Sequence, residues 1–264
     1  MAGGNLATDA NSQARRMMQG RSRRDTAGGC RVADAGPDTP HDFLDICMEN
    51  STHDTSAHAA ASAAATPIGP LELVEYPHPA LLRRAKPLLR IDDAVCEAVE
   101  QMFEIMYAAE GIGLAANQVA LPYRIFIVNT AGRRGEGQEL VFINPTLSRP
   151  RGTAVQEEGC LSLPGLRMDV RRPERIVVEA WSLDGTPIHL DLEGMLARVV
   201  QHEFDHLEGR LFTDRLPEVA SIEARRTLES FREVFLGQQL RSALPGNAEI
   251  VARLERLEAA RCTA

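Results

Sequence analysis

The 264-residue sequence predicts an α+β fold, in which short antiparallel strands combine with several amphipathic helices. Two hairpins lead to this prediction: one pairs residues 123–129 with 140–143, and the other pairs 176–183 with 186–192. Each joins two runs of strand character through a polar turn that contains glycine. Apolar residues at helical spacing before and after the hairpins predict the helices.

Four helices are predicted where apolar residues recur every three or four positions. They span residues 91–109, 196–207, 217–235 and 248–260. Asp92 precedes the first apolar position of the first helix and is expected to be its N-cap. The second helix carries apolar residues on several sides, so it is expected to be central and buried. The third is expected to be a core helix, and the fourth is amphipathic.

Proline and glycine mark the places where regular structure is expected to stop. The strand 140–143 is expected to end at the Asn-Pro pair 144–145. Pro164 and Gly165 are expected to leave their surroundings irregular. The Asp-Gly pair 184–185 is typical of a two-residue hairpin turn.

Residues 1–66 are expected to form a disordered N-terminal extension, because small and polar residues dominate and no apolar period is sustained. Arginines gather in its first 24 residues, as in organellar transit peptides, but acidic residues follow them. The run 43–48 is a candidate docking turn. A folded domain is expected at 67–240, and a C-terminal tail at 241–264 contains the fourth helix.

Composition argues against several classes of function. The formal net charge of −8 does not suit a general nucleic-acid binder, and no direct sequence-specific binding of nucleic acid is expected. No apolar run approaches the roughly 18 residues of a membrane span, so no membrane partner is expected. The five cysteines are odd in number and widely spaced, which argues against a disulfide framework and for a reducing compartment.

The second predicted helix contains the pattern HExxH at 202–206. His202 and His206 are four residues apart, so both imidazoles lie on one face of a helix and can converge on a single cation. Glu203 lies roughly 100° around the same helix, where it can reach a water molecule without being a ligand. The pattern is therefore typical of two metal ligands and a general base.

A catalytic metal site needs three protein ligands and one open position. Cys160 is the best candidate for the third ligand, because glycine and proline shape its surroundings and no other cysteine has such a context. A thiolate favours softer ions such as ferrous iron or zinc over magnesium.

Hydrolysis of an amide-like carbonyl also needs donors that stabilise an oxyanion. The side-chain amide of Gln118 and the backbone N–H of Leu161 are candidates for this role. Gln118 follows a glycine-rich stretch, 111–116, that lets the backbone approach a ligand closely.

Three stretches together resemble the three motifs of the peptide deformylase family. They read GIGLAANQ at 111–118, EGCLS at 158–162 and QHEFDH at 201–206. Their order and separations also fit the family, and the resemblance covers roughly residues 68–240. It implies small antiparallel sheets around a central metal-binding HExxH helix, with a C-terminal helix, and makes residues 67–240 the catalytic domain.

The resemblance implies a metal-dependent hydrolase that removes the formyl group from the N-terminal formyl-methionine of newly synthesised polypeptides and releases formate. Cys160, His202 and His206 would hold one divalent ion, natively Fe2+, which Zn2+, Ni2+ or Co2+ can replace. Metal-bound hydroxide would attack the formyl carbon, with Glu203 as general base and then acid. The implied partners are N-formylmethionyl nascent peptides and, near its exit site, the ribosome.

Further roles follow from the same resemblance. Gln118 and the Leu161 N–H would stabilise the oxyanion. The residues implied in substrate binding are Ile112, Gly113, Gly159, Arg167 and Val199. Glu158 and Arg172 occupy positions whose charges hold loops together.

The residues alone leave two other functions open. A zinc endopeptidase shares the histidine helix, but its third ligand would normally be a downstream His or Glu, and no histidine follows His206. A non-catalytic, metal-stabilised module could dock on ribosomes through Arg253, Arg256 and Arg261, yet it would have no use for Glu203. A bacterial cytoplasm is the simplest location, with the mitochondrion or plastid as the alternative.

Overall fold

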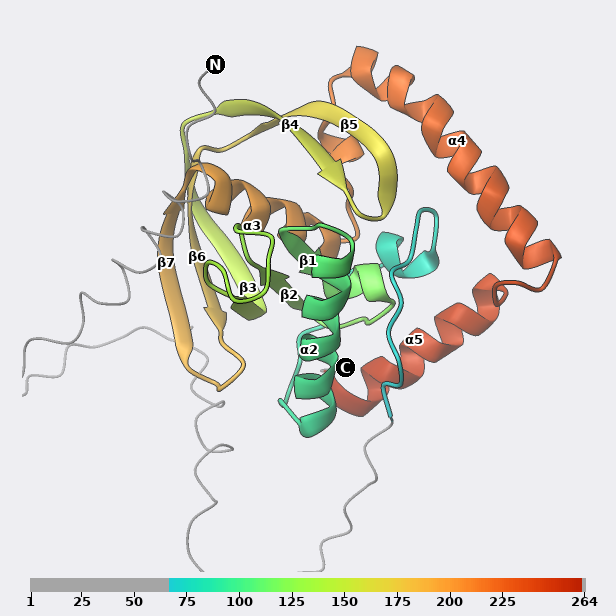
Figure 1. Cartoon of the computed structure of the whole chain (residues 1–264), viewed down its shortest axis with the longest axis horizontal. Helices are drawn as coiled ribbons and strands as arrows, with labels where there is room; N and C mark the ends of the chain where they lie inside the picture. The colour runs from blue at the N-terminus through green and yellow to red at the C-terminus, as the bar shows by residue number, and fades with distance from the viewer. Residues whose placement is uncertain (1–66, 263–264) are drawn as a thin grey trace, which may run out of the picture.

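The computed structural model describes residues 67–262. The predicted disorder of residues 1–66 and the candidate docking turn at 43–48 lie outside the described residues. Within them the chain forms an α+β fold, as predicted (Figure 1). In chain order the elements are η2 (Pro79–Leu82), α2 (Asp93–Ala108), β1 (Gly113–Ala115), η3 (Ala116–Val119), β2 (Ile125–Val128), β3 (Leu140–Arg151), β4 (Ala154–Cys160), β5 (Leu163–Arg172), β6 (Arg175–Trp181), β7 (Pro187–Glu193), α3 (Gly194–Leu207), η4 (Phe212–Arg215), α4 (Glu218–Leu240) and α5 (Asn247–Arg261).

Two antiparallel sheets enclose helix α3. The larger has the strand order β1-β2-β3-β6-β7, and the smaller consists of β4 and β5 alone. Figure 1 shows α3 running between them. Leu196, Ala197 and Val200 of α3 pack into the core of the five-stranded sheet, whereas Arg198 reaches the backbone of β4 and β5. This central position agrees with the apolar residues predicted on several sides of the helix.

Helix α2 begins where the sequence predicts. The side chain of Asp92 accepts a hydrogen bond from the backbone N–H of Val95 at 3.0 Å, which is the N-cap interaction. The apolar residues of α2, including Met102 and Met106, are buried in the main core cluster.

Strand β3 does not end at the Asn-Pro pair, so that prediction is wrong. It continues to Arg151 and pairs with β6 beyond a register shift that follows Ile143. Asn144 adopts a φ of 51°, and its side-chain amide both accepts from and donates to the backbone of Leu88 at 2.8 Å. The amide holds a bulge in place, and the strand bends there instead of stopping.

The region around Pro164 and Gly165 is regular, contrary to prediction. Residues on both sides of it form the β4–β5 hairpin, in which Cys160 pairs with Leu163 at the turn. Within residues 67–262, β4 and β5 pair only with each other, so Pro164 lies on a strand whose other edge has no partner strand there and where a missing N–H costs little.

The turn between β6 and β7 is longer than the predicted two residues. Trp181 pairs with Pro187, so residues 182–186 form the connection. The backbone N–H of Ser182 donates to the carbonyl of Thr186 at 2.9 Å, which closes a loop of three residues.

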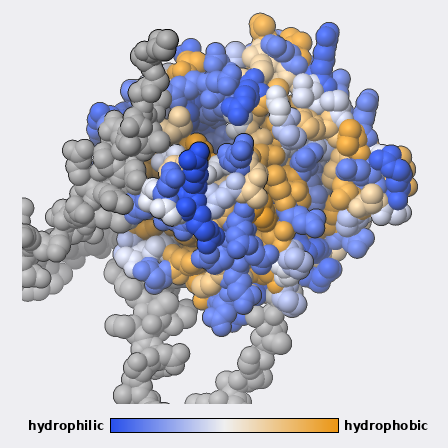
Figure 2. Space-filling view, viewed as in Figure 1, coloured by the Kyte–Doolittle hydropathy of each residue, from blue (hydrophilic) through white to orange (hydrophobic). Residues whose placement is uncertain are grey.

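Helix α4 is not the core helix that its apolar residues predict. Ala224 and Phe235 are buried, but Val219 is 81% exposed, Ile222 57% and Leu240 87%. The helix lies at the outside of the molecule (Figure 1), and hydrophobic residues gather at the surface over it (Figure 2). It packs along one side only, so its other apolar residues remain in solvent.

Helix α5 shows the predicted amphipathic pattern. Ile250, Leu254 and Leu257 are buried, and Leu257 belongs to the same core cluster as α2. The backbone of Cys262 forms a bridge with Leu88. Residues 247–262 are thus packed onto the body of the protein.

His78 is buried beside α4 and α5 and makes stability depend on pH. Its Nδ1 accepts a hydrogen bond from the N–H of Ala80 at 3.2 Å, and its ring meets Phe235 edge-on. Burial, together with the charge of Arg253, lowers the pKa of His78 from 6.5 to about 4. The unfolded chain therefore binds this proton more readily than the folded chain does. The stabilisation that neutral His78 gives the folded chain is complete above pH 6.5 and is lost as the pH falls toward 4.

We expect lowering the pH from 7 to 4.5 to cost the wild type about 2–3 kcal/mol more in free energy of unfolding than His78→Asn. Asparagine can accept the hydrogen bond from Ala80 but does not titrate. Urea unfolding at both pH values measures this difference. Equal losses in the two proteins would show that His78 does not contribute to acid sensitivity.

Candidate metal centre and active site

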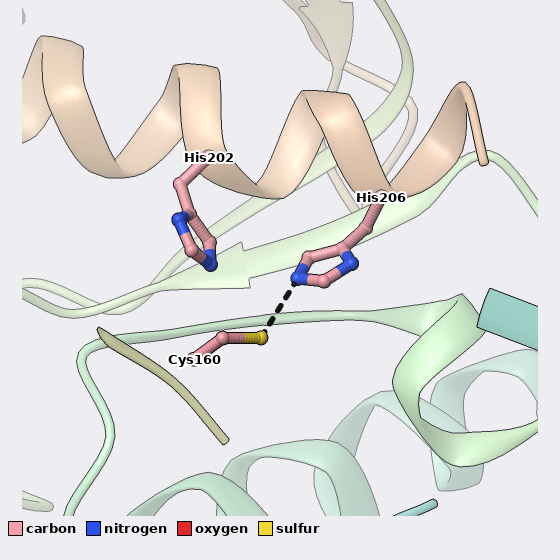
Figure 3. Close-up of side chains that lie close together, drawn as sticks. All are labelled: Cys160, His202 and His206. Atoms are coloured by element: carbon pink, nitrogen blue, oxygen red, sulfur yellow. Dashed lines mark hydrogen bonds between the residues drawn. The ribbon is translucent and has the colours of Figure 1, made fainter. Parts of the chain in front are cut away.

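Three predicted ligand side chains meet at one place. Cys160 is the last residue of β4, and His202 and His206 lie one turn apart on α3. Figure 3 shows both imidazoles directed from the helix toward the sulfur. The Sγ of Cys160 is 3.3 Å from Nε2 of His206, and one potential ligand atom from each residue lies within 4.8 Å of the others. All three side chains are buried.

The chemistry of these side chains suits a divalent cation. One thiolate and two imidazoles form a donor set typical of iron and zinc, and three protein ligands leave a position open for water. Burial lowers the pKa of His202, but hydrogen bonds to Cys160 and Glu158 outweigh it and raise this pKa to about 10. A positive charge on His202 is thus stabilised between Cys160 and Glu158.

A buried ionic network supports the helix from the side of the small sheet. Glu158 of β4 accepts hydrogen bonds from Arg172 at 2.6 and 2.9 Å and lies 2.9 Å from Nδ1 of His202. Arg172 also donates to Asp205 at 2.7 Å. Burial raises the pKa of Glu158, yet the bonds from His202 and Arg172 outweigh this and hold it well below its ordinary value. Glu158 is therefore an ionised acceptor for His202.

Arg198 and Asp205 belong to this network, although the sequence reasoning did not single them out. Arg198 donates to Glu158 at 2.6 Å, and Asp205 lies between the two histidines on α3. Helical spacing could have indicated Arg198, because it lies four residues before His202 on the same face.

Glu203 lies on the side of α3 that faces strand β1. It is buried, and among residues 67–262 no hydrogen-bond partner is present for its Oε2. Burial raises the pKa of Glu203 to about 7, although the charge of His202 opposes this. A Cβ on Gly113 would lie 2.5 Å from Oε1 of Glu203 and 2.7 Å from Val199. Only glycine at 113 therefore lets β1 pass this close to the carboxylate.

The amide of Gln118 is oriented toward the sulfur of Cys160. Its Oε1 accepts from the N–H of Ala115 at 2.8 Å, so its Nε2 points the other way. That nitrogen lies 3.5 Å from the Sγ of Cys160 and 3.3 Å from the Oγ of Ser162. The Gln118 N–H groups are thus next to the predicted metal ligand Cys160, the position expected of an oxyanion donor.

An open cleft of about 630 Å³ leads to these groups. Its lining includes every predicted site residue except His206. These are Ile112, Gly113, Gln118, Gly159, Cys160, Leu161, Arg167, Val199, His202 and Glu203. The side chain of Arg167 is 68% exposed and lies 3.7 Å from Glu157, so it stands at the rim of the cleft. The structure places these residues around one space, large enough for a side chain and the peptide that carries it.

A small α+β fold in which a buried cysteine meets an HExxH helix defines a class of metal-dependent hydrolases. The sequence model of the family "Polypeptide deformylase" matches residues 70–221, more than half of the chain. The chain therefore belongs to the polypeptide deformylase family. It is an enzyme that acts on formylated nascent peptides.

Individual relatives agree with the family match. A peptide deformylase of Rhodopirellula baltica is 38% identical over 72% of this chain and 94% of its own length. The chloroplastic peptide deformylase 1B of Solanum lycopersicum is 40% identical over 70% of this chain, which spans 65% of that protein. The crystal structure of plant peptide deformylase PDF1B superposes with a TM-score of 0.63 at 34% identity, covering 73% of this chain and 98% of that one.

These similarities decide among the functions that the residues left open. They support the deformylase and favour neither the zinc endopeptidase nor the non-catalytic module.

Among the described residues no helix is both long and apolar enough to cross a membrane. The three cysteines in the same range are all free.

Proposed function

We propose that this enzyme removes the formyl group from the formyl-methionine of new polypeptides with a divalent cation held by Cys160, His202 and His206. The observation that carries the proposal is the convergence of a cysteine sulfur from β4 and two imidazoles from α3 within 4.8 Å. When bound, the cation supplies an acidified water molecule and polarises the formyl carbonyl.

The residues around the ligands divide the remaining work. Glu203 is held close to β1 and takes the proton from the attacking water, then gives it to the departing amine. Gln118 Nε2 and the Leu161 N–H donate to the carbonyl oxygen as negative charge develops on it. The N–H of Ala115 already holds the amide of Gln118, so this donor needs little reorganisation during the reaction.

The cleft holds the substrate in an extended form. Gly113 and Gly159 both line the cleft, and their backbones pair with the peptide main chain. Ile112 and Val199 form the wall of the methionine pocket. Arg167 stands at the rim and meets the peptide as it leaves the cleft.

Fe2+ is the ion we propose for the cell, with Zn2+, Ni2+ or Co2+ as substitutes. A single soft thiolate beside two imidazoles suits each of them. We expect anaerobically purified protein to contain iron and to release formate from formyl-Met-Ala-Ser. Formate assays combined with elemental analysis test substrate and cofactor together. Cleavage of unformylated internal peptide bonds without formate release would contradict the proposal.

Contact with the ribosome is a further part of the proposal. The C-terminal helix supports it less than expected, because Arg261 is buried against Asp92 and Arg253 donates to backbone carbonyls. The exposed apolar side chains of α4 offer a better surface. Cosedimentation with ribosomes tests this, since Leu240→Glu should weaken binding, and equal binding would count against α4.

We also propose a bacterial cytoplasm as the location. Relatives occur both in bacteria and in plastids or mitochondria. The acidic residues that follow the N-terminal arginines do not suit a transit peptide. Uptake of the full chain by isolated plastids or mitochondria would overturn this proposal.

A further inference from the structure

The metal ligands come from two separate parts of the fold, which must be held in a fixed position relative to each other. Cys160 belongs to the β4–β5 hairpin, whereas His202 and His206 belong to α3. The hairpin is a sheet of its own and does not pair with the five-stranded sheet. The distance from sulfur to imidazole therefore depends on the side chains that join the hairpin to α3.

Arg198 joins these two parts through three hydrogen bonds. It projects from α3 and donates to the carbonyl of Ala154 on β4 at 2.9 Å and to that of Val170 on β5 at 3.1 Å. The same guanidinium donates to Glu158 at 2.6 Å. One buried side chain therefore contacts both strands of the hairpin and the carboxylate that bonds His202.

The carboxylate of Glu158 connects this contact to the metal site. Its Oε1 accepts from Arg198 and Arg172, and its Oε2 accepts from Arg172 and lies 2.9 Å from Nδ1 of His202. A hydrogen bond to Nδ1 fixes the imidazole tautomer that leaves Nε2 free to bind a cation. Arg172 comes from the hairpin, but Arg198 lies one turn from His202 on the same helix. Arg198 thus ties Glu158 to the helix whose histidine it orients.

We propose that Arg198 is a positioning residue for the metal centre, which fixes Glu158 against His202 and the strand of Cys160 against α3. This inference rests on the proposed metal site. Arg198 also lines the cleft, and a side chain that only contacted substrate would affect KM and leave metal affinity unchanged. Metal affinity therefore distinguishes the two roles.

The experiment uses Co2+, whose bond to a thiolate gives a charge-transfer band, as the probe of the full-length protein. We expect Arg198→Met to bind Co2+ about 10–100-fold more weakly than wild type in competition with a chelator. The charge-transfer band should also shift or weaken. Arg198→Lys keeps the charge but cannot reach all three acceptors, so its affinity should be intermediate. KM for a formylated peptide should change less than Co2+ affinity.

Arg253→Met is the matched control. Arg253 also donates to two backbone carbonyls from separate segments, those of Ala120 and Ile68, but it lies on α5. The Arg253→Met variant should lose thermal stability, while its Co2+ affinity should stay within twofold of wild type. A Co2+ affinity of Arg198→Met within twofold of wild type would overturn the inference. If Arg198→Met does not fold, a Co2+ affinity of Arg198→Lys within twofold of wild type would overturn it instead. A wild type without the thiolate band would overturn the proposed metal site and this inference with it.

Discussion

Glu203→Gln will keep its metal but lose most of its deformylase activity. Glutamine has the size of glutamate and can fill the same space beside Gly113, but it cannot accept a proton from water. We expect kcat/KM for formyl-Met-Ala-Ser to fall by about 10²–10⁴-fold, the usual contribution of a general acid or base. Formate release measured on protein of known metal content gives this ratio.

A second glutamate provides the control for this experiment. Glu223 is exposed on α4, away from the cleft, so Glu223→Gln should match the wild type in activity and metal content. A Glu203→Gln enzyme with activity close to that of the wild type would rule out the general-base role. Loss of metal in that variant would instead place Glu203 among the ligands.

Cys160→Ala will fail to retain the cation. The substitution removes the only thiolate of the cluster and leaves two imidazoles, which cannot complete a three-ligand site. Metal content should fall from near one ion per chain to below about 0.1 after purification, and formate release should fall with it. Elemental analysis of the anaerobically purified variant measures this directly.

Cys262 is a suitable comparison for that substitution. It is also a buried free cysteine, but its sulfur lies 3.8 Å from the carbonyl of Lys86, far from α3 in the chain, and it is absent from the candidate cluster. Burial raises its pKa to about 12, so it is a neutral thiol. Cys262→Ala should keep its metal. Full metal content in Cys160→Ala would show that the sulfur is not a ligand.

The site could be anticipated from the sequence where its geometry is local. The spacing of His202 and His206 fixes both on one face of a helix, whatever surrounds it. The apolar residues around them predict burial of that helix, and the structure agrees. Cys160 is distant in sequence, and it stood out only because glycine and proline surround it.

The parts that could not be anticipated depend on tertiary contacts. Glycine and proline signals at 164–165 argued for irregular structure, but pairing of β4 with β5 overrides them. The bulge at Asn144 depends on hydrogen bonds to Leu88, which is 56 residues away. In α4, apolar residues occur on both sides, and no local pattern distinguishes exposed Val219 from Phe235, which packs inward.

One sulfur and two imidazole nitrogens are expected to bind the same cation. X-ray absorption at the metal edge of the iron- or zinc-loaded protein tests it most directly. We expect one sulfur at about 2.3 Å and two nitrogens at about 2.0–2.1 Å for zinc, with a light atom completing the shell. The sulfur should disappear from the spectrum of any metal that Cys160→Ala still binds. A wild-type shell of nitrogen and oxygen alone would show that Cys160 is not a ligand.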